Sequence, residues 1–210
     1  MGIKNLSKVI ERHAPQAKRE SQITEYSSRI IAIDASILLY QFISSVRDQT
    51  GSTLRNEYGE TTSHIIGTFY RTIKFLEHNI RPVYVFDGKP PELKNEELAK
   101  RNENAQKARE ELQEAIEQGD EEKAKSLAKR TARMTIEQSN EVKKLLELMG
   151  IPCIDAECEA EATCAELVKL GKCYATATED MDALTLGSNI VLRKFTPSAD
   201  KDKPDRTSVV

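Results

Sequence analysis

The sequence has no apolar run long enough to cross a lipid bilayer. Its longest apolar stretches, near residues 30–33 and 37–40, fall far short of the roughly 20 residues that a membrane helix needs. The first ten residues contain two lysines and no apolar core, so they do not form a secretory signal peptide. We therefore expect an intracellular protein with no membrane partner.

The sequence also lacks the cysteine spacing of a zinc site. No C-x-x-C pair occurs, and no histidine lies near the four cysteines, which are Cys153, Cys158, Cys164 and Cys173. We interpret them as reduced thiols in and around the carboxyl-terminal half of the core, as in a reducing compartment. The three histidines are scattered along the chain, so each is expected to pack or cap rather than catalyse.

A net positive charge, which is common in nucleic-acid-binding proteins, is absent as well. The chain carries 31 Lys and Arg against 34 Asp and Glu, a formal net charge of -3. This average hides a pattern, because residues 109–122 contain seven acids and one arginine, whereas residues 123–144 are rich in basic side chains. A phosphate backbone responds to local basic patches rather than to net charge. Weak overall acidity therefore does not exclude DNA as a partner.

What the sequence does contain is a set of short apolar runs that are followed by acids. The runs are R-I-I-A-I, R-P-V-Y-V-F, I-P-C-I and C-Y-A-T-A-T, and the acids after them are Asp34, Asp87, Glu159, Glu161, Asp180 and Asp182. Apolar runs separated by helical patterns indicate buried parallel strands, whose carboxyl ends meet at one sheet edge. Carboxylates gathered there would raise one another's pKa unless cations compensate them. The sequence therefore predicts a divalent-metal site.

The spacing within two acidic motifs supports this interpretation. In E-A-E and D-M-D the acids are two residues apart, and such side chains share a face only on extended backbone. We expect both pairs at strand ends or in the first helical turn, with Ala160 and Met181 facing the core. An alternative exists for single acids, because Asp34 could be only a helix N-cap and Glu159 could only complement a helix dipole. The convergence of six carboxylates favours the metal, and their oxygens suit Mg²⁺.

The remaining pattern is typical of one α/β domain over residues 1–195, followed by a polar tail over 196–210 that we expect to be disordered. Helical periodicity predicts helices over 6–13, 36–47, 62–79 and 159–170, and apolar runs predict strands over 30–33, 83–86, 173–178 and near residues 153 and 190. Residues 92–135 are helix-forming but poor in large apolar side chains. They form either a solvated helical hairpin or a cap over the acidic edge, and we favour the cap.

Nine sequence blocks follow one another over nearly the whole chain. They are M-G-I-K-N-L, A-I-D-A-S, N-E-x-G-E-T-T-S-H, F-Y-R-T-I, P-V-Y-V-F-D-G-K-P-P-E-L-K, L-A-K-R, L-M-G-I-P, E-A-E-A and A-T-E-D-M-D-A-L-T-x-G-S. In these blocks the chain resembles the flap endonucleases, the structure-specific 5′ nucleases of DNA replication and repair. The resemblance implies a PIN-like α/β fold, with a mostly parallel sheet, flanking helices and a protruding helical arch. It also implies 5′ flap endonuclease and 5′-3′ exonuclease activity on branched DNA in the nucleus, with the mitochondrion as a second location.

The resemblance assigns a role to individual residues. The six acids match ligands of two Mg²⁺ ions, with Mn²⁺ as an alternative metal. Lys94 and Arg101 match arch residues that contact the scissile phosphate, and their i, i+7 spacing places them on one helix face. Tyr40 matches an aromatic residue that stacks on a base near the cut. The other positions that match DNA contacts are Gly2, Arg47, Glu57, Gly59, Glu60, Thr62 and Arg71.

The chain departs from the family pattern at a few positions and at its end. Tyr58 replaces an acid of the loop that accommodates a 3′ flap, and Asn104 and Ala105 stand where basic arch residues are expected. The family's further metal-binding aspartate, its K⁺-dependent helix-two-turn-helix and its sliding-clamp motif are not found before Val210. A catalytically impaired DNA-junction-binding fragment is therefore the alternative, because a misplaced substrate costs about 100-fold in rate. A Mg²⁺ phosphatase with Asp34 as nucleophile is less favoured, because that strand lacks D-x-D.

Overall fold

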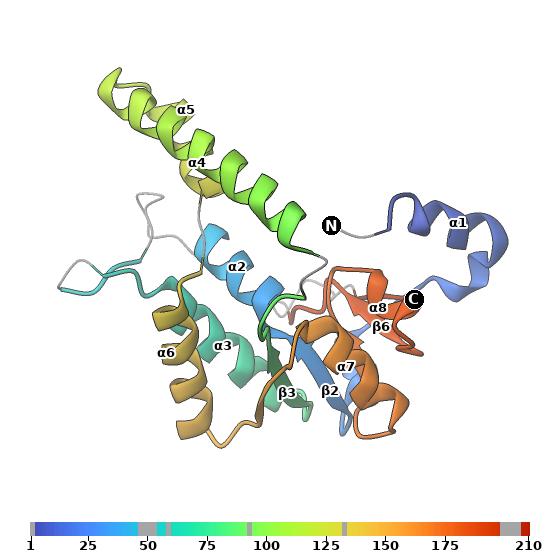
Figure 1. Cartoon of the computed structure of the whole chain (residues 1–210). Coiled ribbons are helices and arrows are strands. Elements are labelled where there is room, and N and C mark those ends of the chain that lie inside the picture. Colours follow the sequence, from blue (N-terminus) through green and yellow to red (C-terminus); the bar gives the residue numbers. More distant parts are fainter. Residues whose placement is uncertain (1–2, 46–53, 58–59, 92–93, 132–133, 198–206) are drawn as a thin grey trace.

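The fold is built on one twisted sheet that is mostly parallel. The computed structural model describes residues 3–45, 54–57, 60–91, 94–131, 134–197 and 207–210 (Figure 1). Within them, seven strands follow the order β1-β7-β6-β5-β2-β3-β4. Their bounds are Arg19–Ser21 (β1), Ile30–Asp34 (β2), Arg81–Phe86 (β3), Cys153–Asp155 (β4), Ala175–Ala177 (β5), Val191–Arg193 (β6) and Thr207–Val209 (β7). The strands from β6 to β4 are parallel, whereas β7 pairs antiparallel with β6 and β1.

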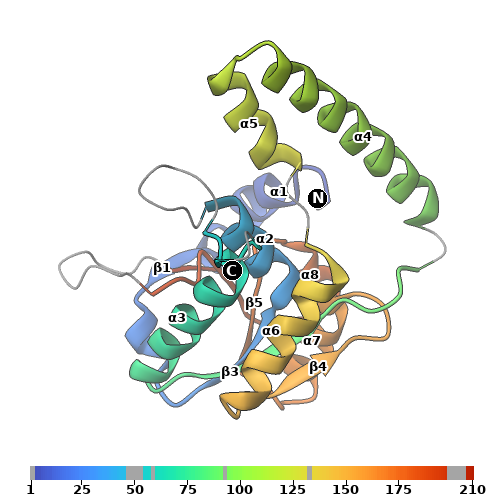
Figure 2. The same ribbon diagram turned by 90° about the vertical axis from the view of Figure 1, so that its left-hand side faces the viewer.

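Helices cover both faces of this sheet. They are α1 (Leu6–His13), α2 (Ala35–Ser45), α3 (Ser63–Glu77), α4 (Asn95–Glu117), α5 (Glu121–Thr131), α6 (Ile136–Leu148), α7 (Ala160–Lys169) and α8 (Asp182–Thr185), with 3₁₀ turns at Pro15–Ala17 and Ile23–Tyr26. Figures 1 and 2 show α2, α3 and α6 on one face and α7 on the other. The predicted α/β class, with helices on both sides of a mostly parallel sheet, is confirmed.

The alternation of side chains along β2 explains how one short strand serves two cores. Ile31 and Ile33 point to the face that α2, α3 and α6 cover, where they join Leu39, Phe42, Phe75, Val142 and Leu146. Ala32 points to the other face, where it meets Cys164 and Ala160 of α7. Burial of each large apolar side chain contributes about 1.5–3 kcal/mol. The larger core therefore holds the sheet, and the small side chains opposite allow α7 to pack closely.

The arch predicted over residues 92–135 is present as a helical hairpin. α4 and α5, which follow β3 and precede α6 in the chain, project away from the sheet (Figure 1). They pack on each other through a small core of Ala108, Ala115 and Leu127, which are buried. Thr135 then begins α6 with a capping box, in which its hydroxyl accepts from the Gln138 amide. No helix in the described ranges has the length and apolar character needed to cross a membrane.

The end of the chain corrects a prediction. We expected residues 196–210 to form a disordered tail, but Thr207–Val209 is β7, and Thr207 and Val209 are buried. The run T-S-V-V is rich in β-branched side chains, which favour strands. The charged residues before it dominate the average composition of the tail and hid this signal. Sequence analysis also missed β1, because R-E-S contains no apolar run. This segment is a strand because it pairs with β7.

Candidate active site

The strands that carry the predicted acids are neighbours in the sheet. β5, β2, β3 and β4 lie side by side and run parallel, so their carboxyl ends open on one edge. Asp34 ends β2 and Asp87 follows β3, whereas the E-A-E acids lie at the start of α7 after β4. In the D-M-D motif, Asp180 lies between β5 and α8, and Asp182 is the first residue of α8. The structure therefore brings all six predicted acids to the same edge.

Asp34 is both a helix cap and a member of the acidic group. Its Oδ1 accepts the backbone N–H groups of Ser36 at 3.1 Å and Ile37 at 3.4 Å, and its Oδ2 accepts the Thr178 hydroxyl at 3.2 Å. The side chain is 6% exposed. Burial, followed by the charge of Asp87, raises the pKa of Asp34 to about 6. The N-cap alternative was thus correct, but it does not exclude a role in the site.

Asp87 is fixed by the loop that leads into α7. Its Oδ1 accepts the backbone N–H of Ala160 at 2.8 Å. The next residue, Gly88, donates its N–H to the Cys158 carbonyl at 2.8 Å. A Cβ on Gly88 would lie 1.9 Å from the Ala156 carbonyl oxygen, so only glycine permits this approach. The close contact between the loop that follows β3 and the loop that precedes α7 therefore holds Asp87 beside the start of α7.

The E-A-E and D-M-D motifs lie at the starts of α7 and α8, as predicted for the first helical turn, although Met181 within D-M-D has helical rather than extended backbone. Glu159 has extended backbone at the N-cap of α7, and Glu161 lies in the first turn. The intervening Ala160 and Met181 are buried, as predicted. Burial raises the pKa of Glu161 to about 7, and the charges of Asp180, Glu159 and Asp34 add to this rise. The acids thus face one another closely enough to oppose each other's ionisation.

Backbone contacts hold the D-M-D segment in place. Asp180 receives the Asp182 N–H on its Oδ1 at 3.1 Å, and its own N–H donates to the Thr178 hydroxyl at 3.2 Å. Asp182 in turn accepts the Ile3 N–H at 2.7 Å, so the amino-terminal segment lies against the acidic edge. Thr178 therefore supports both Asp34 and Asp180. Sequence reasoning missed it, although its position at the end of the β5 run was a usable signal.

The six carboxylates are suitable ligands for a hard divalent cation, which binds oxygen atoms. Burial and neighbouring carboxylates raise the pKa values of Asp34 and Glu161, so a bound cation would compensate their charge. Among the residues that the structure describes, no group of three or more His, Cys, Asp or Glu side chains could hold a metal ion. The cation that the structure does place among these acids is the Lys94 ammonium, which pairs with Glu159. The assignment of the six acids as metal ligands stays a prediction.

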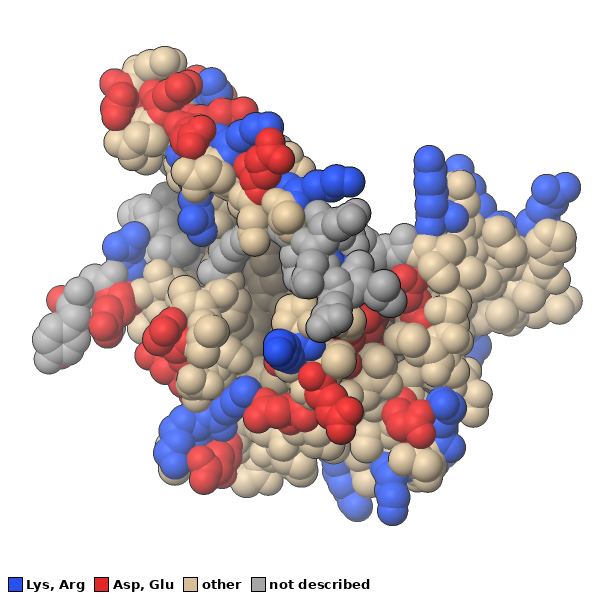
Figure 3. Space-filling model, in the orientation of Figure 1, with Lys and Arg blue, Asp and Glu red and all other residues tan. Residues whose placement is uncertain are grey.

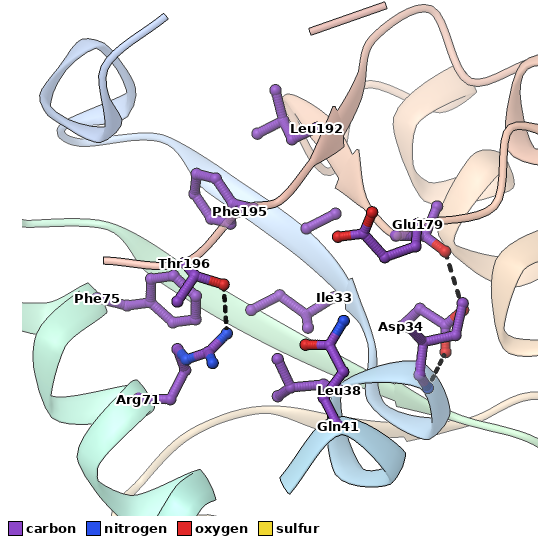
Figure 4. A pocket seen from close by; sticks show the side chains of 13 residues that line it. Ile33, Asp34, Leu38, Gln41, Arg71, Phe75, Glu179, Leu192, Phe195 and Thr196 are labelled. Carbon is purple, nitrogen blue, oxygen red and sulfur yellow. Dashed lines mark hydrogen bonds between the residues drawn. The ribbon is translucent and has the colours of Figure 1, made fainter. Parts of the chain in front are cut away.

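A cavity lies beside Asp34, between α2, α3 and the end of β6. Its volume is about 30 Å³, and Figure 4 shows Arg71 and Gln41 in its wall. Arg71 donates to the Thr196 hydroxyl at 2.8 Å, and its guanidinium lies 5.0 Å from the centroid of the Phe42 ring. Burial lowers the pKa of Arg71. The predicted DNA contact at Arg71 is thus a partly buried cation within reach of the acidic edge.

The other predicted contacts lie farther along the surface. Tyr40 of α2 is 46% exposed. Glu57 and Glu60 are exposed on a turn that the Glu60 N–H closes on Asn56 Oδ1 at 2.9 Å, and Thr62 directly precedes α3. Arg101 lies on α4, but its side chain is outside the description, and the remaining predicted contacts, Gly2, Arg47 and Gly59, lie outside the described residues. Their roles stay predictions.

Charge is unevenly distributed over the hairpin. Figure 3 shows acidic side chains gathered at its outer end, where the exposed residues Glu110, Glu111, Glu114, Glu117, Asp120 and Glu122 lie. Lys94 at the base of α4 and the exposed Lys100 and Lys107 lie nearer the sheet. The acids outnumber the exposed Arg109 and Lys123 at the outer end, so a phosphate chain near the hairpin is attracted more to the base than to the tip.

Two protein-family models match most of the chain. The XPG N-terminal domain matches residues 1–108, and the XPG I-region matches residues 150–210. The chain belongs to the XPG family. It is 70% identical over 206 residues to "Flap endonuclease 1" of Entamoeba dispar, which covers 98% of this chain and 55% of the relative. It is 56% identical over 204 residues to "Flap endonuclease 1" of Anoplopoma fimbria, with 97% and 53% covered. The chain thus spans about half the length of these relatives.

Solved structures agree with this membership. The flap endonuclease-1 from Methanococcus jannaschii aligns with a TM-score of 0.67 and 36% identity, over 92% of this chain and 60% of that one. The catalytic core of Rad2 in complex with DNA substrate aligns with a TM-score of 0.66 and 32% identity, over 95% and 52%. The predicted resemblance to the flap endonucleases and the predicted PIN-like fold are therefore confirmed.

Proposed function

We propose that this chain is the nuclease body of a structure-specific DNA endonuclease, with 5′ flap endonuclease and 5′-3′ exonuclease activity in replication and repair. The observation that carries the proposal is the convergence of six carboxylates at the carboxyl ends of four adjacent parallel strands, where Lys94 at the base of α4 pairs with Glu159. Flap endonucleases that are up to 70% identical support the reaction class. The Rad2 core in complex with DNA substrate supports DNA as the partner.

The acids would hold the metal ions, which we propose to be two Mg²⁺ ions with Mn²⁺ as an alternative. The ligands would be Asp34, Asp87, Glu159, Glu161, Asp180 and Asp182. When bound, such ions make a reactive hydroxide from water and neutralise charge on the scissile phosphate and the leaving oxygen. A related resolving enzyme named GEN1, solved with product DNA and Mg²⁺, is consistent with this metal class.

The protein's own side chains would position the DNA. Lys94, beside Glu159, would meet the scissile phosphate at the base of the hairpin, and Arg101 would follow two helical turns along α4. Tyr40 offers an exposed ring on which an unpaired base can stack. Arg71 would contact the phosphate backbone from the cavity wall next to Asp34.

Cleavage of a labelled double-flap DNA, with and without Mg²⁺, tests the proposal. Asp182→Ala is expected to abolish metal-dependent cutting, because it removes one carboxylate from the edge. Asp155→Asn is a matched control, since Asp155 also ends a neighbouring strand but is 69% exposed and pairs with Lys143 outside the acidic group. Cutting that needs no metal, or that survives Asp182→Ala, would refute the proposal.

A non-cleaving DNA-junction binder is the second candidate. Among the described residues no group of three or more His, Cys, Asp or Glu side chains could hold an ion, and a misplaced substrate alone costs about 100-fold in rate. Tight binding of the flap DNA without any cleavage would favour this candidate. Phosphate release from small esters would instead favour a phosphatase that uses Asp34.

We also propose a nuclear location, with the mitochondrion as a second site of action, because flap processing belongs to DNA replication and repair. A fluorescent carboxyl-terminal fusion expressed in cells tests this proposal. Uniform exclusion of the fusion from both compartments would contradict it.

A further inference from the structure

Within the part of the chain that the structure describes, an ion pair joins the base of the hairpin to the acidic edge. The Lys94 ammonium donates to Oε1 of Glu159, and the two side chains are 40% and 30% exposed. Lys94 is the N-cap residue of α4, whereas Glu159 is the N-cap residue of α7 on the opposite side of the edge. The pair therefore bridges the arch and a predicted metal ligand.

Lys94 acts on more than its direct partner. Glu159 is the N-cap residue of α7 and Glu161 lies in the first turn of that helix, so the ammonium that pairs with Glu159 lies beside a second predicted metal ligand. Its positive charge therefore lies among the carboxylates and partly neutralises them. The described acids form no group that could hold an ion in this arrangement, while the ammonium engages one of them.

We propose that Lys94 is an internal counter-ion that competes with divalent metal for Glu159, so that metal entry releases Lys94 to face the DNA phosphate. This inference rests on the proposed metal-dependent function and adds a second role for Lys94. A cation that takes Glu159 as a ligand must displace the ammonium from Oε1 or share the carboxylate with it. When the ammonium is displaced, the metal gains Glu159 as a ligand, and Lys94 at the base of the hairpin loses its ion pair with Glu159 in the same event.

The proposal makes an unusual prediction about the Lys94→Gln variant. The variant should bind metal more tightly than the wild type while cutting DNA more slowly. A solvent-accessible ion pair contributes up to about 1 kcal/mol, so its removal should lower the metal dissociation constant by about 2- to 5-fold. Salt screens such a pair, so the difference should shrink at about 1 M ionic strength, where the Debye length is about 3 Å.

The experiment is a Mn²⁺ titration of the full chain without DNA, followed by electron paramagnetic resonance of the free ion. Lys94→Arg keeps the charge and should bind Mn²⁺ like the wild type. Lys107→Gln is the matched control, because Lys107 pairs with Glu103 on the same helix. It lies 13 residues farther along α4, about 20 Å from Lys94 and beyond a Debye length of about 8 Å. This control should leave the Mn²⁺ affinity unchanged.

The outcomes separate this inference from the function on which it rests. Unchanged or weaker Mn²⁺ binding by Lys94→Gln would overturn the competition, even if the wild type cuts flap DNA as proposed. Equal tightening in Lys107→Gln would also overturn it, since the effect would then reflect net charge alone. If neither the wild type nor Lys94→Gln binds Mn²⁺, both the competition and the metal-dependent function fail.

Discussion

Asp34→Asn should stabilise the metal-free protein at neutral pH. Asp34 is almost fully buried, and its pKa rises from 3.8 to about 6, with burial as the main cause. At about 1.4 kcal/mol for each pKa unit, ionisation of the folded protein costs about 3 kcal/mol more than ionisation of the unfolded chain. Asparagine has the same shape, and its Oδ1 can still accept from Ser36. The substitution therefore removes the charge and keeps the cap.

The sign of the pH dependence follows from the raised pKa. Between about pH 4 and pH 6 the folded protein keeps a proton on Asp34 that the unfolded chain has lost. The wild type therefore loses stability as the pH rises through this window, whereas Asp34→Asn does not. Glu161 adds to the slope, because its pKa is raised to about 7, but its contact with solvent reduces the contribution.

Urea unfolding in EDTA, at pH 4 and pH 7.5, measures the effect. The two proteins should be nearly equal at pH 4, and the variant should be more stable by up to about 3 kcal/mol at pH 7.5. Asp155→Asn, at an exposed strand end, should show no such gain. Added Mg²⁺ should reverse the order, because it stabilises the protein that binds it. Equal or lower stability of Asp34→Asn at pH 7.5 in EDTA would refute the reasoning.

Two further predictions concern packing around the site. Gly88→Ala should destabilise the fold by more than about 2 kcal/mol, because its Cβ would meet the Ala156 carbonyl, whereas Gly119→Ala in the open hairpin turn should cost only about 1 kcal/mol. Thermal unfolding of both variants checks this order, which a milder effect at Gly88 would contradict. Tyr84→Phe should cost about 1 kcal/mol, since Thr72 Oγ1 lies 2.8 Å from the buried phenol oxygen. Combined with Thr72→Val it should cost less than the sum, and additive losses in a double-mutant cycle would contradict the pairing.

The sequence was most informative where local pattern and position in the sheet coincide. The apolar runs before Asp34 and Asp87 predicted buried parallel strands, and parallel strands must share an edge at their carboxyl ends. The burial of Ala160 and Met181 followed from the two-residue spacing of the acids around them. These predictions needed no knowledge of contacts between distant segments.

The missed features depend on partners that are far away in the sequence. The three residues of β1 form a strand only because β7 pairs with them, and no local signal marks that partner. Thr178 supports Asp34 across 144 positions of sequence. The pair between Lys94 and Glu159 likewise joins segments that hydrophobic periodicity cannot relate. Sequence spacing identified the acids, but the groups that position them required the fold.

The hairpin of α4 and α5 also bears on how such a chain can change over time. Its two helices pack on each other, with Ala108, Ala115 and Leu127 buried, and in the chain the hairpin lies between β3 and α6. A turn of helix could be added to or removed from both arms without moving a single strand of the sheet. Length variation in the hairpin would therefore change how far it projects, while the acidic edge of the sheet stays intact.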